Sequence, residues 1–190
     1  MNKLLKGAIA GAAGVALLLG GAGTFALWNS TETVSGGTVA SGTLTIAKSG
    51  SPSWKNVSSD AAVGGVVIPA ISSYKIVPGD KIELTQVVTI NATGNNLKAT
   101  LSYDDATVTT VTPADDALKS ELLVTVDATG SANVARIGTG NTFAVTPSGS
   151  SSTVTLTVTI ELPSSVAGTT AQAGTVGLTA FGFNLEQDVR

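Results

Sequence analysis

The stretch Thr153-Val154-Thr155-Leu156-Thr157-Val158-Thr159-Ile160-Glu161-Leu162 alternates polar and aliphatic residues over its whole length. Successive side chains of a β-strand point to opposite faces of the sheet, so this alternation places every aliphatic side chain on one face. Residues 82–90 alternate in the same way, with Ile82, Leu84, Val88 and Ile90 on one face. Both stretches predict half-buried strands, and they set the character of the whole chain.

Shorter stretches of similar composition surround these two and are bounded by Gly, Ser, Asn and Pro, which favour turns. Residues 48–60 are expected to form a Ser-Gly-Pro loop, and the Asn-Gly cluster between residues 82–90 and 97–103 predicts an antiparallel pair. The last stretch is apolar on both faces near its end, which predicts a central or covered strand. Besides residues 82–90 and 153–162, strands are expected at residues 38–47, 63–71, 97–103, 107–111, 122–127, 133–137, 142–145 and 174–185.

Two local motifs interrupt the strands. Residues 113–120 predict one or two helical turns, because Thr112 can cap the helix, Pro113 suits its first position and acidic residues follow. Pro78-Gly79 suits a type II turn, in which Asp80 is expected to accept hydrogen bonds from nearby backbone.

Roughly eight to ten short strands and one short helix predict an all-β domain built as a two-sheet β-sandwich. Alternation alone does not choose between an immunoglobulin-like and a jelly-roll topology. Val, Thr, Ala, Gly and Ser dominate and aromatic residues make up only 4% of the chain, so the core is expected to consist of small β-branched side chains.

The composition excludes several kinds of chemistry. The chain has no cysteine and no histidine, which rules out disulfides, cysteine nucleophiles and any triad with a histidine base. A zinc site would need carboxylates alone, so we expect no metal, no cofactor and no catalytic residue. The formal charge is −3 and no basic patch is present, which argues against nucleic acid as a partner.

The N-terminus has the layout of a secretory signal peptide. Lys3 and Lys6 precede an uncharged apolar run over residues 7–21, and small residues lead to Ala26. Cleavage between Ala26 and Leu27 would also remove both lysines, making the remaining chain more acidic. The alternative is a retained membrane anchor, because the uncharged run is almost long enough to span a bilayer.

The residues that follow carry a resemblance. Leu27-Trp28-Asn29-Ser30-Thr31-Glu32 is followed about ten residues later by Ala40-Ser41-Gly42-Thr43-Leu44. Together with the signal layout, this pattern resembles the TasA–camelysin family of exported fibre-forming proteins. Leu27-Trp28 replaces the family's more usual small-then-Phe pair, which leaves the cleaved bond uncertain by about one residue.

The resemblance implies a fold, a partner and a mechanism. It implies a jelly roll, processing by a dedicated signal peptidase, and self-assembly in which each subunit donates a strand to its neighbour. The donated segment would be the arm at residues 27–42, anchored by Leu27, Trp28, Val34 and Val39. Some camelysin-type relatives are regarded as metalloproteases, but no His-Glu-x-x-His helix is present, so that activity is not carried over.

Paired or spaced acidic residues are the remaining candidates for a site. Asp104-Asp105 and Asp115-Asp116 could bind Ca²⁺, but neither pair lies in a loop with the spaced pattern of an EF-hand. Glu83, Glu121 and Glu161 could in principle supply a glycosidase pair, although few aromatic residues are available to bind a sugar. We expect all of them to be structural or solvated charges.

These observations divide the chain into a signal peptide at residues 1–26, an arm at 27–42 and a β-sandwich at 43–190. The favoured hypothesis is a secreted, non-enzymatic fibre subunit of an extracellular matrix or cell surface. Its partners would be copies of itself and the signal peptidase, and it would meet the membrane only through the uncleaved signal. The alternatives are a monomeric binding module for a wall polymer or partner protein, and a metalloprotease.

Overall fold

The structure is a computed structural model, and it describes residues 2–21, 35–169, 171–178 and 181–189. The chain forms two units, residues 1–39 and residues 40–190. The first contains helix α1, Lys3–Gly21. Among the described residues, no helix has both the length and the apolar character needed to cross a membrane.

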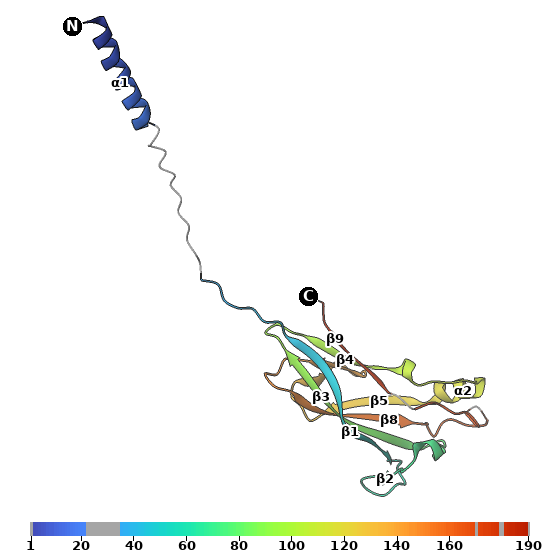
Figure 1. The fold of residues 1–190 in the computed structure, drawn as a ribbon. Helices are drawn as coiled ribbons and strands as arrows, with labels where there is room; N and C mark the ends of the chain where they lie inside the picture. The colour runs from blue at the N-terminus through green and yellow to red at the C-terminus, as the bar shows by residue number, and fades with distance from the viewer. Residues whose placement is uncertain (1, 22–34, 170, 179–180, 190) are drawn as a thin grey trace. The chain divides into compact units, whose positions relative to one another are not determined.

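The second unit consists of two antiparallel sheets, with strand order β2-β1-β3-β8-β5 in one and β6-β7-β4-β9 in the other (Figure 1). The prediction of an all-β sandwich is therefore confirmed at the level of two packed sheets. The strands are β1 Thr43–Asn56, β2 Val66–Val67, β3 Lys81–Thr93, β4 Ala99–Asp104, β5 Leu123–Thr129, β6 Val134–Arg136, β7 Thr142–Val145, β8 Ser152–Glu161 and β9 Gly182–Gln187.

The core lies between the inner faces of the two sheets. The aliphatic face predicted for β8 is buried, with Val154, Leu156, Val158 and Ile160 at most 1% exposed. The alternating residues of β3 are buried on the same side, so both stretches that led the sequence analysis form central strands. Each such side chain contributes about 1.5–3 kcal/mol through burial of apolar surface. The facing sheet supplies Ala99, Leu101, Phe143 and Val145.

Helix α2, Pro113–Glu121, confirms the predicted helical turns. The Thr112 side chain accepts the backbone N–H of Asp115, and the Asp115 carboxylate accepts the backbone N–H of Thr112. This reciprocal capping box satisfies two N–H groups that a helix start otherwise leaves without partners. Two 3₁₀ turns, Ile71–Ser73 and Asp105–Thr107, complete the helical segments of the described residues.

The loop expected at residues 48–60 is wrong for its first half, because β1 continues to Asn56. A β-bulge between Ser49 and Ser53 takes up Gly50-Ser51-Pro52, and pairing with β3 then resumes at Ser53 opposite Thr85. A bulge leaves its extra residues outside the ladder, so Gly and Pro are tolerated there, and this explains why the sequence resembles a loop. The strand also starts later than expected, since residues 38–42 are in neither helix nor strand.

The antiparallel pair expected from residues 82–90 and 97–103 does not form. β3 pairs with β1 on one side and with β8 on the other, so neither of its edges is available to β4. The chain instead crosses to the second sheet, where β4 pairs with β7 and β9. The turn between them therefore joins two layers of the sandwich.

The last strand was expected to be central or covered. It is not central, because β9 stands at the end of its sheet and pairs with β4 alone. Phe183 of β9 and Phe181 just before the strand are half-buried by other aromatic rings, which accounts for the apolar pattern. Two further expected strands are much reduced. Only Val66–Val67 of residues 63–71 is a strand, and residues 107–111 contain just an isolated bridge from Thr109 to Gly177.

Candidate functional site

The residues predicted to act in cleavage and donation lie mostly outside the described residues. These are Ala26, Leu27, Trp28 and Val34. Val39 is described, and its side chain is 99% exposed. Residues 35–42 around it are exposed and belong to neither helix nor strand. This part of the arm therefore has no strand partner among the described residues.

The acidic residues considered as ligands have structural roles. Asp80 accepts the Val77 backbone N–H at 2.9 Å and the Tyr74 hydroxyl at 3.3 Å, which confirms the expected turn. Asp115 is buried, and it accepts the backbone N–H of Thr175 as well as that of Thr112. These hydrogen bonds, Thr175 first, lower the pKa of Asp115 to about 2.

The other carboxylates form local contacts. Asp104 caps the following 3₁₀ turn by accepting the Ala106 N–H at 3.0 Å. Glu161 pairs with Lys81 at 2.8 Å across two neighbouring strands, with both side chains well exposed. In the part of the chain that the structure describes, no group of three acidic side chains could hold a metal ion. Asp104 and Glu161 are thus engaged in local structure.

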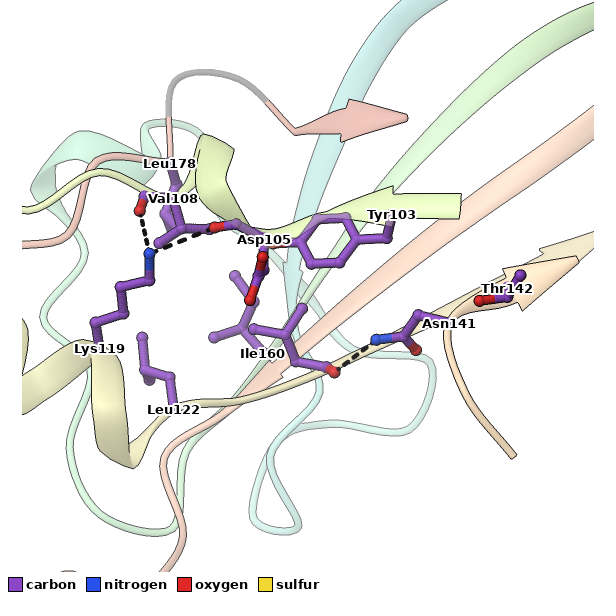
Figure 2. A pocket seen from close by; sticks show the side chains of 10 residues that line it. Tyr103, Asp105, Val108, Lys119, Leu122, Asn141, Thr142, Ile160 and Leu178 are labelled. Carbon is purple, nitrogen blue, oxygen red and sulfur yellow. Dashed lines mark hydrogen bonds between the residues drawn. The ribbon is translucent and has the colours of Figure 1, made fainter. Parts of the chain in front are cut away.

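Two cavities open at the sandwich. The larger, about 750 Å³, lies against Ile82 and Leu162 and is bordered by the segments 71–78 and 171–178. The smaller, about 390 Å³, is lined by Tyr103, Lys119 and Asn141, among others (Figure 2). Lys119 is engaged there, because its ammonium donates to the Val108 carbonyl oxygen at 2.7 Å.

The Tyr103 hydroxyl in the smaller cavity is buried and has no hydrogen-bond partner among the described residues. Burial, with smaller contributions from Asp105 and Asp104, raises the pKa of Tyr103 to about 12. The group is therefore neutral at physiological pH and unsuited to act as a base. Neither cavity brings together a nucleophile, a base and an electrophilic group.

The edge of β1 is the more informative surface. β2 covers only Lys55 and Asn56 of this strand, and Ile68 donates to the Trp54 carbonyl oxygen. No described strand pairs with the outer side of β1 before that point. We call residues 44–48 on this side the open edge.

The register shows which backbone groups the open edge presents. Ala92 is opposite Leu44, and its carbonyl oxygen accepts the Ser148 N–H at 3.0 Å, on the side away from β1. In an antiparallel ladder the two members of such a pair both direct their N–H and C=O groups outward. Leu44, Ile46 and Lys48 therefore present their backbone groups to the outside, while Leu44 and Ile46 pack their side chains on the core.

The free edge of the other sheet lies on the same flank. β9 ends its sheet, and its Cα atoms approach those of β1 to within 8 Å although the two strands are not paired. Aromatic rings fill the space between the sheets here. Trp54 of β1 contacts Phe181 at 6.0 Å between ring centroids, and Tyr103 contacts both Phe181 and Phe183. We call β1 and β9 together with these rings the β1–β9 flank.

Comparison with known protein families, with curated proteins and with solved structures gives no match to this chain. The functional argument therefore depends on the residues and the geometry above. Sequence reasoning predicted a strand at residues 38–47 but not that its outer side is unpaired. The order of the strands in a sheet depends on contacts between distant segments, and no local signal in residues 44–48 reveals it.

Proposed function

We propose that this chain is a secreted structural subunit that polymerises by strand addition: the arm of one copy pairs with the open edge of the next. The observation that carries the proposal is the unpaired outer side of β1 directly after residues 35–42, which are exposed and in neither helix nor strand. An unpaired edge presents a row of N–H and C=O groups, and an added strand satisfies them while its side chains give specificity.

The dimensions of the two segments agree. Residues 27–42 would span about 53 Å if extended, and the open edge at residues 44–48 spans about 17 Å, at about 3.3 Å per residue. The arm is therefore long enough to cover the open edge and still connect two subunits. Leu27, Trp28, Val34 and Val39 supply apolar side chains whose burial would drive association.

Such an arrangement is directional. The arm belongs to the donor and the open edge to the acceptor, so each copy uses two different surfaces. A heterologous contact of this kind does not close on itself unless the rotation between copies happens to close a ring, and it otherwise produces filaments. The function proposed here is thus structural rather than enzymatic, and it requires no cofactor.

The finer features of the proposal come from the sequence. The signal layout of residues 1–26 supports export and removal by a signal peptidase, which would free Leu27 as the new N-terminus. The resemblance to the TasA–camelysin family supports a jelly-roll connection of the strands and a place in an extracellular matrix or at the cell surface. Before cleavage, residues 1–26 would keep the arm at the membrane and suppress assembly.

Secreted protein tests the proposal directly. We expect its N-terminus at or within one residue of Leu27, and filaments in electron micrographs of the concentrated protein. Deletion of residues 27–37 should abolish the filaments and leave the circular dichroism spectrum of the sandwich unchanged. Monomers that persist at high concentration with an intact arm would contradict the proposal.

A binding module is the second candidate function, and the cavity of about 750 Å³ favours it. Its volume lies in the range of small-molecule sites. The same deletion separates the two functions. A binding module lacking residues 27–37 would keep its ligand and would show no change in oligomeric state.

A further inference from the structure

The outer edge of β5 is the opposite end of the five-stranded sheet, and side chains occupy it. The Val126 backbone N–H donates to Asn141 Oδ1 at 2.8 Å, and Asn141 Nδ2 donates to the Val124 carbonyl oxygen at 3.1 Å. The side-chain amide of Asn141 thus makes the two hydrogen bonds that a neighbouring peptide group would make, and Figure 2 shows the one that its nitrogen donates.

The next backbone groups along β5 are satisfied in the same manner. Arg136 Nη2 donates to the Val126 carbonyl oxygen at 2.5 Å and to Asp127 Oδ1 at 3.0 Å. Asp127 Oδ1 also accepts the Ala128 backbone N–H at 2.9 Å. Four consecutive outward groups of residues 124–128 therefore have side-chain partners, and we call this stretch the sealed edge.

The two side chains that reach across are held from the other sheet. Arg136 belongs to β6 and Asn141 precedes β7, so both come from one hairpin. The Asn141 carbonyl oxygen accepts the Tyr103 N–H from β4 at 3.2 Å. The Arg136 guanidinium lies 4.9 Å from the centroid of the Phe143 ring, and its Nη1 donates to the Gly140 carbonyl oxygen at 2.6 Å. These contacts fix both side chains before any partner arrives.

We infer that Asn141 and Arg136 close the β5 edge to strand addition, so that an arm from a second copy pairs only on the β1–β9 flank. The inference rests on the proposed polymerisation, and it explains why each subunit would accept an arm at one edge of this sheet and not at both. Two open edges on one sheet would allow two arms to bind each subunit, which leads to branched or lateral growth. With one edge sealed, each copy accepts one arm and the product is a linear filament.

Hydrogen exchange of the wild-type protein tests the inference without any substitution. On assembly, the amides of Leu44, Ile46 and Lys48 should exchange at least about tenfold more slowly, because a partner strand covers them. The amides of Val126 and Ala128 should show no such change. New protection along β5 comparable to that along β1 would overturn the inference while leaving polymerisation itself intact.

A second experiment opens the sealed edge while the open edge is blocked. Lys48→Pro removes an outward N–H of β1 and sets the blocked background. Asn141→Ala is added to this background in one protein. In the matched control, Thr125→Ala is added instead, at an exposed position of β5. We expect the Lys48→Pro/Asn141→Ala protein to form oligomers in sedimentation velocity experiments. At the same concentrations, the Lys48→Pro protein and the Lys48→Pro/Thr125→Ala protein should remain monomeric.

The outcomes of this experiment are distinct. In the variant with Asn141→Ala, the Val126 amide should exchange about tenfold faster than in the Lys48→Pro background, since its acceptor is gone. Fast exchange at Val126 without oligomers would overturn the inference. If Asn141→Ala does not fold, Arg136→Ala removes the cap of the Val126 carbonyl oxygen and is scored in the same way. If the wild-type protein forms no filaments, that result contradicts the proposed function and not the closing of the β5 edge.

Discussion

The two outer sides of the five-stranded sheet differ in how their backbone N–H and C=O groups are satisfied. Along residues 124–128 of β5, side chains from the facing sheet satisfy the outward N–H and C=O groups. Along residues 44–48 of β1 no described strand or side chain does so for the backbone. The difference teaches that two well-anchored side chains can close the edge of a sheet. Where the described residues provide no such side chains, as along residues 44–48, the backbone groups remain accessible to a partner strand.

Lys48→Pro should have the largest effect on the open edge. The proline lacks the outward N–H, and its ring occupies space next to an incoming strand, whereas its intrachain pairing with β3 needs no N–H at this position. We expect filaments to disappear in electron micrographs, with the critical concentration raised at least about tenfold. Lys48→Ala is the control and should assemble normally. If the proline variant assembled at the critical concentration of the wild type, β1 would not be the strand that accepts the arm.

Gly42→Ala should disturb the place where the arm joins the open edge. A Cβ at Gly42 would run into the backbone carbonyl oxygen of Thr93, whereas a Cβ at Gly37 meets nothing within 4 Å. We expect Gly42→Ala to lower the free energy of unfolding by about 1–3 kcal/mol, the range for overpacking against a rigid neighbour. Gly37→Ala should change it by less than about 0.5 kcal/mol. Urea denaturation of both variants measures the difference, and equal effects would contradict the close approach.

Asp115→Asn tests a region that belongs to neither edge. The pKa of Asp115 is lowered from 3.8 to about 2 by the N–H groups of Thr175 and Thr112. Ionised Asp115 therefore stabilises the fold fully above pH 3.8, and this stabilisation is lost as the pH falls toward about 2. We expect a smaller decrease in melting temperature between pH 5 and pH 2 for the variant than for the wild type. If the melting temperatures of the variant and the wild type fall equally, the hydrogen bonds to ionised Asp115 do not contribute to stability.

Arg136→Lys should have the smallest effect on the sealed edge. Lysine keeps the charge but loses the planar fork that reaches both Val126 and Asp127, and it loses stacking on Phe143. The Arg136–Asp127 pair is partly exposed, so we expect a stability loss of up to about 1 kcal/mol. Amide exchange at Val126 and Ala128 should remain closer to the wild type than in Asn141→Ala. A larger effect than that of Asn141→Ala would make Arg136 the main cap.

The parts of the fold that the sequence predicts are those that depend on local pattern. β8 alternates without interruption, β3 does so except at Gln86, and the cap of α2 lies within four consecutive residues. The second half of β1 was hidden because its bulge places Gly50 and Pro52 inside a strand. Partners in a sheet were less predictable, since the turn after β3 has the same residues whether the chain returns beside β3 or crosses to the other layer.

For the candidate site, the sequence predicts only the donor side. That prediction depends on the signal layout and on the residues that follow it, which lie mostly outside the described residues. The acceptor and the sealed edge depend on contacts between distant segments. Asn141 follows Gly138-Thr139-Gly140, which predicts a turn, but nothing in that stretch indicates that its amide reaches β5. Such a contact is specified by the packing of two sheets and not by the residues beside it.

The ring contact between Trp54 and Phe181 gives the molecule a built-in optical probe. Trp28 in the arm is the only other tryptophan, so one indole belongs to the donor segment and one to the flank that would receive it. A Trp28→Phe chain would report on the receiving flank alone, and a Trp54→Phe chain on the arm alone. The order in which folding and filament growth occur can therefore be followed from fluorescence of the protein itself, with no attached dye to perturb either surface.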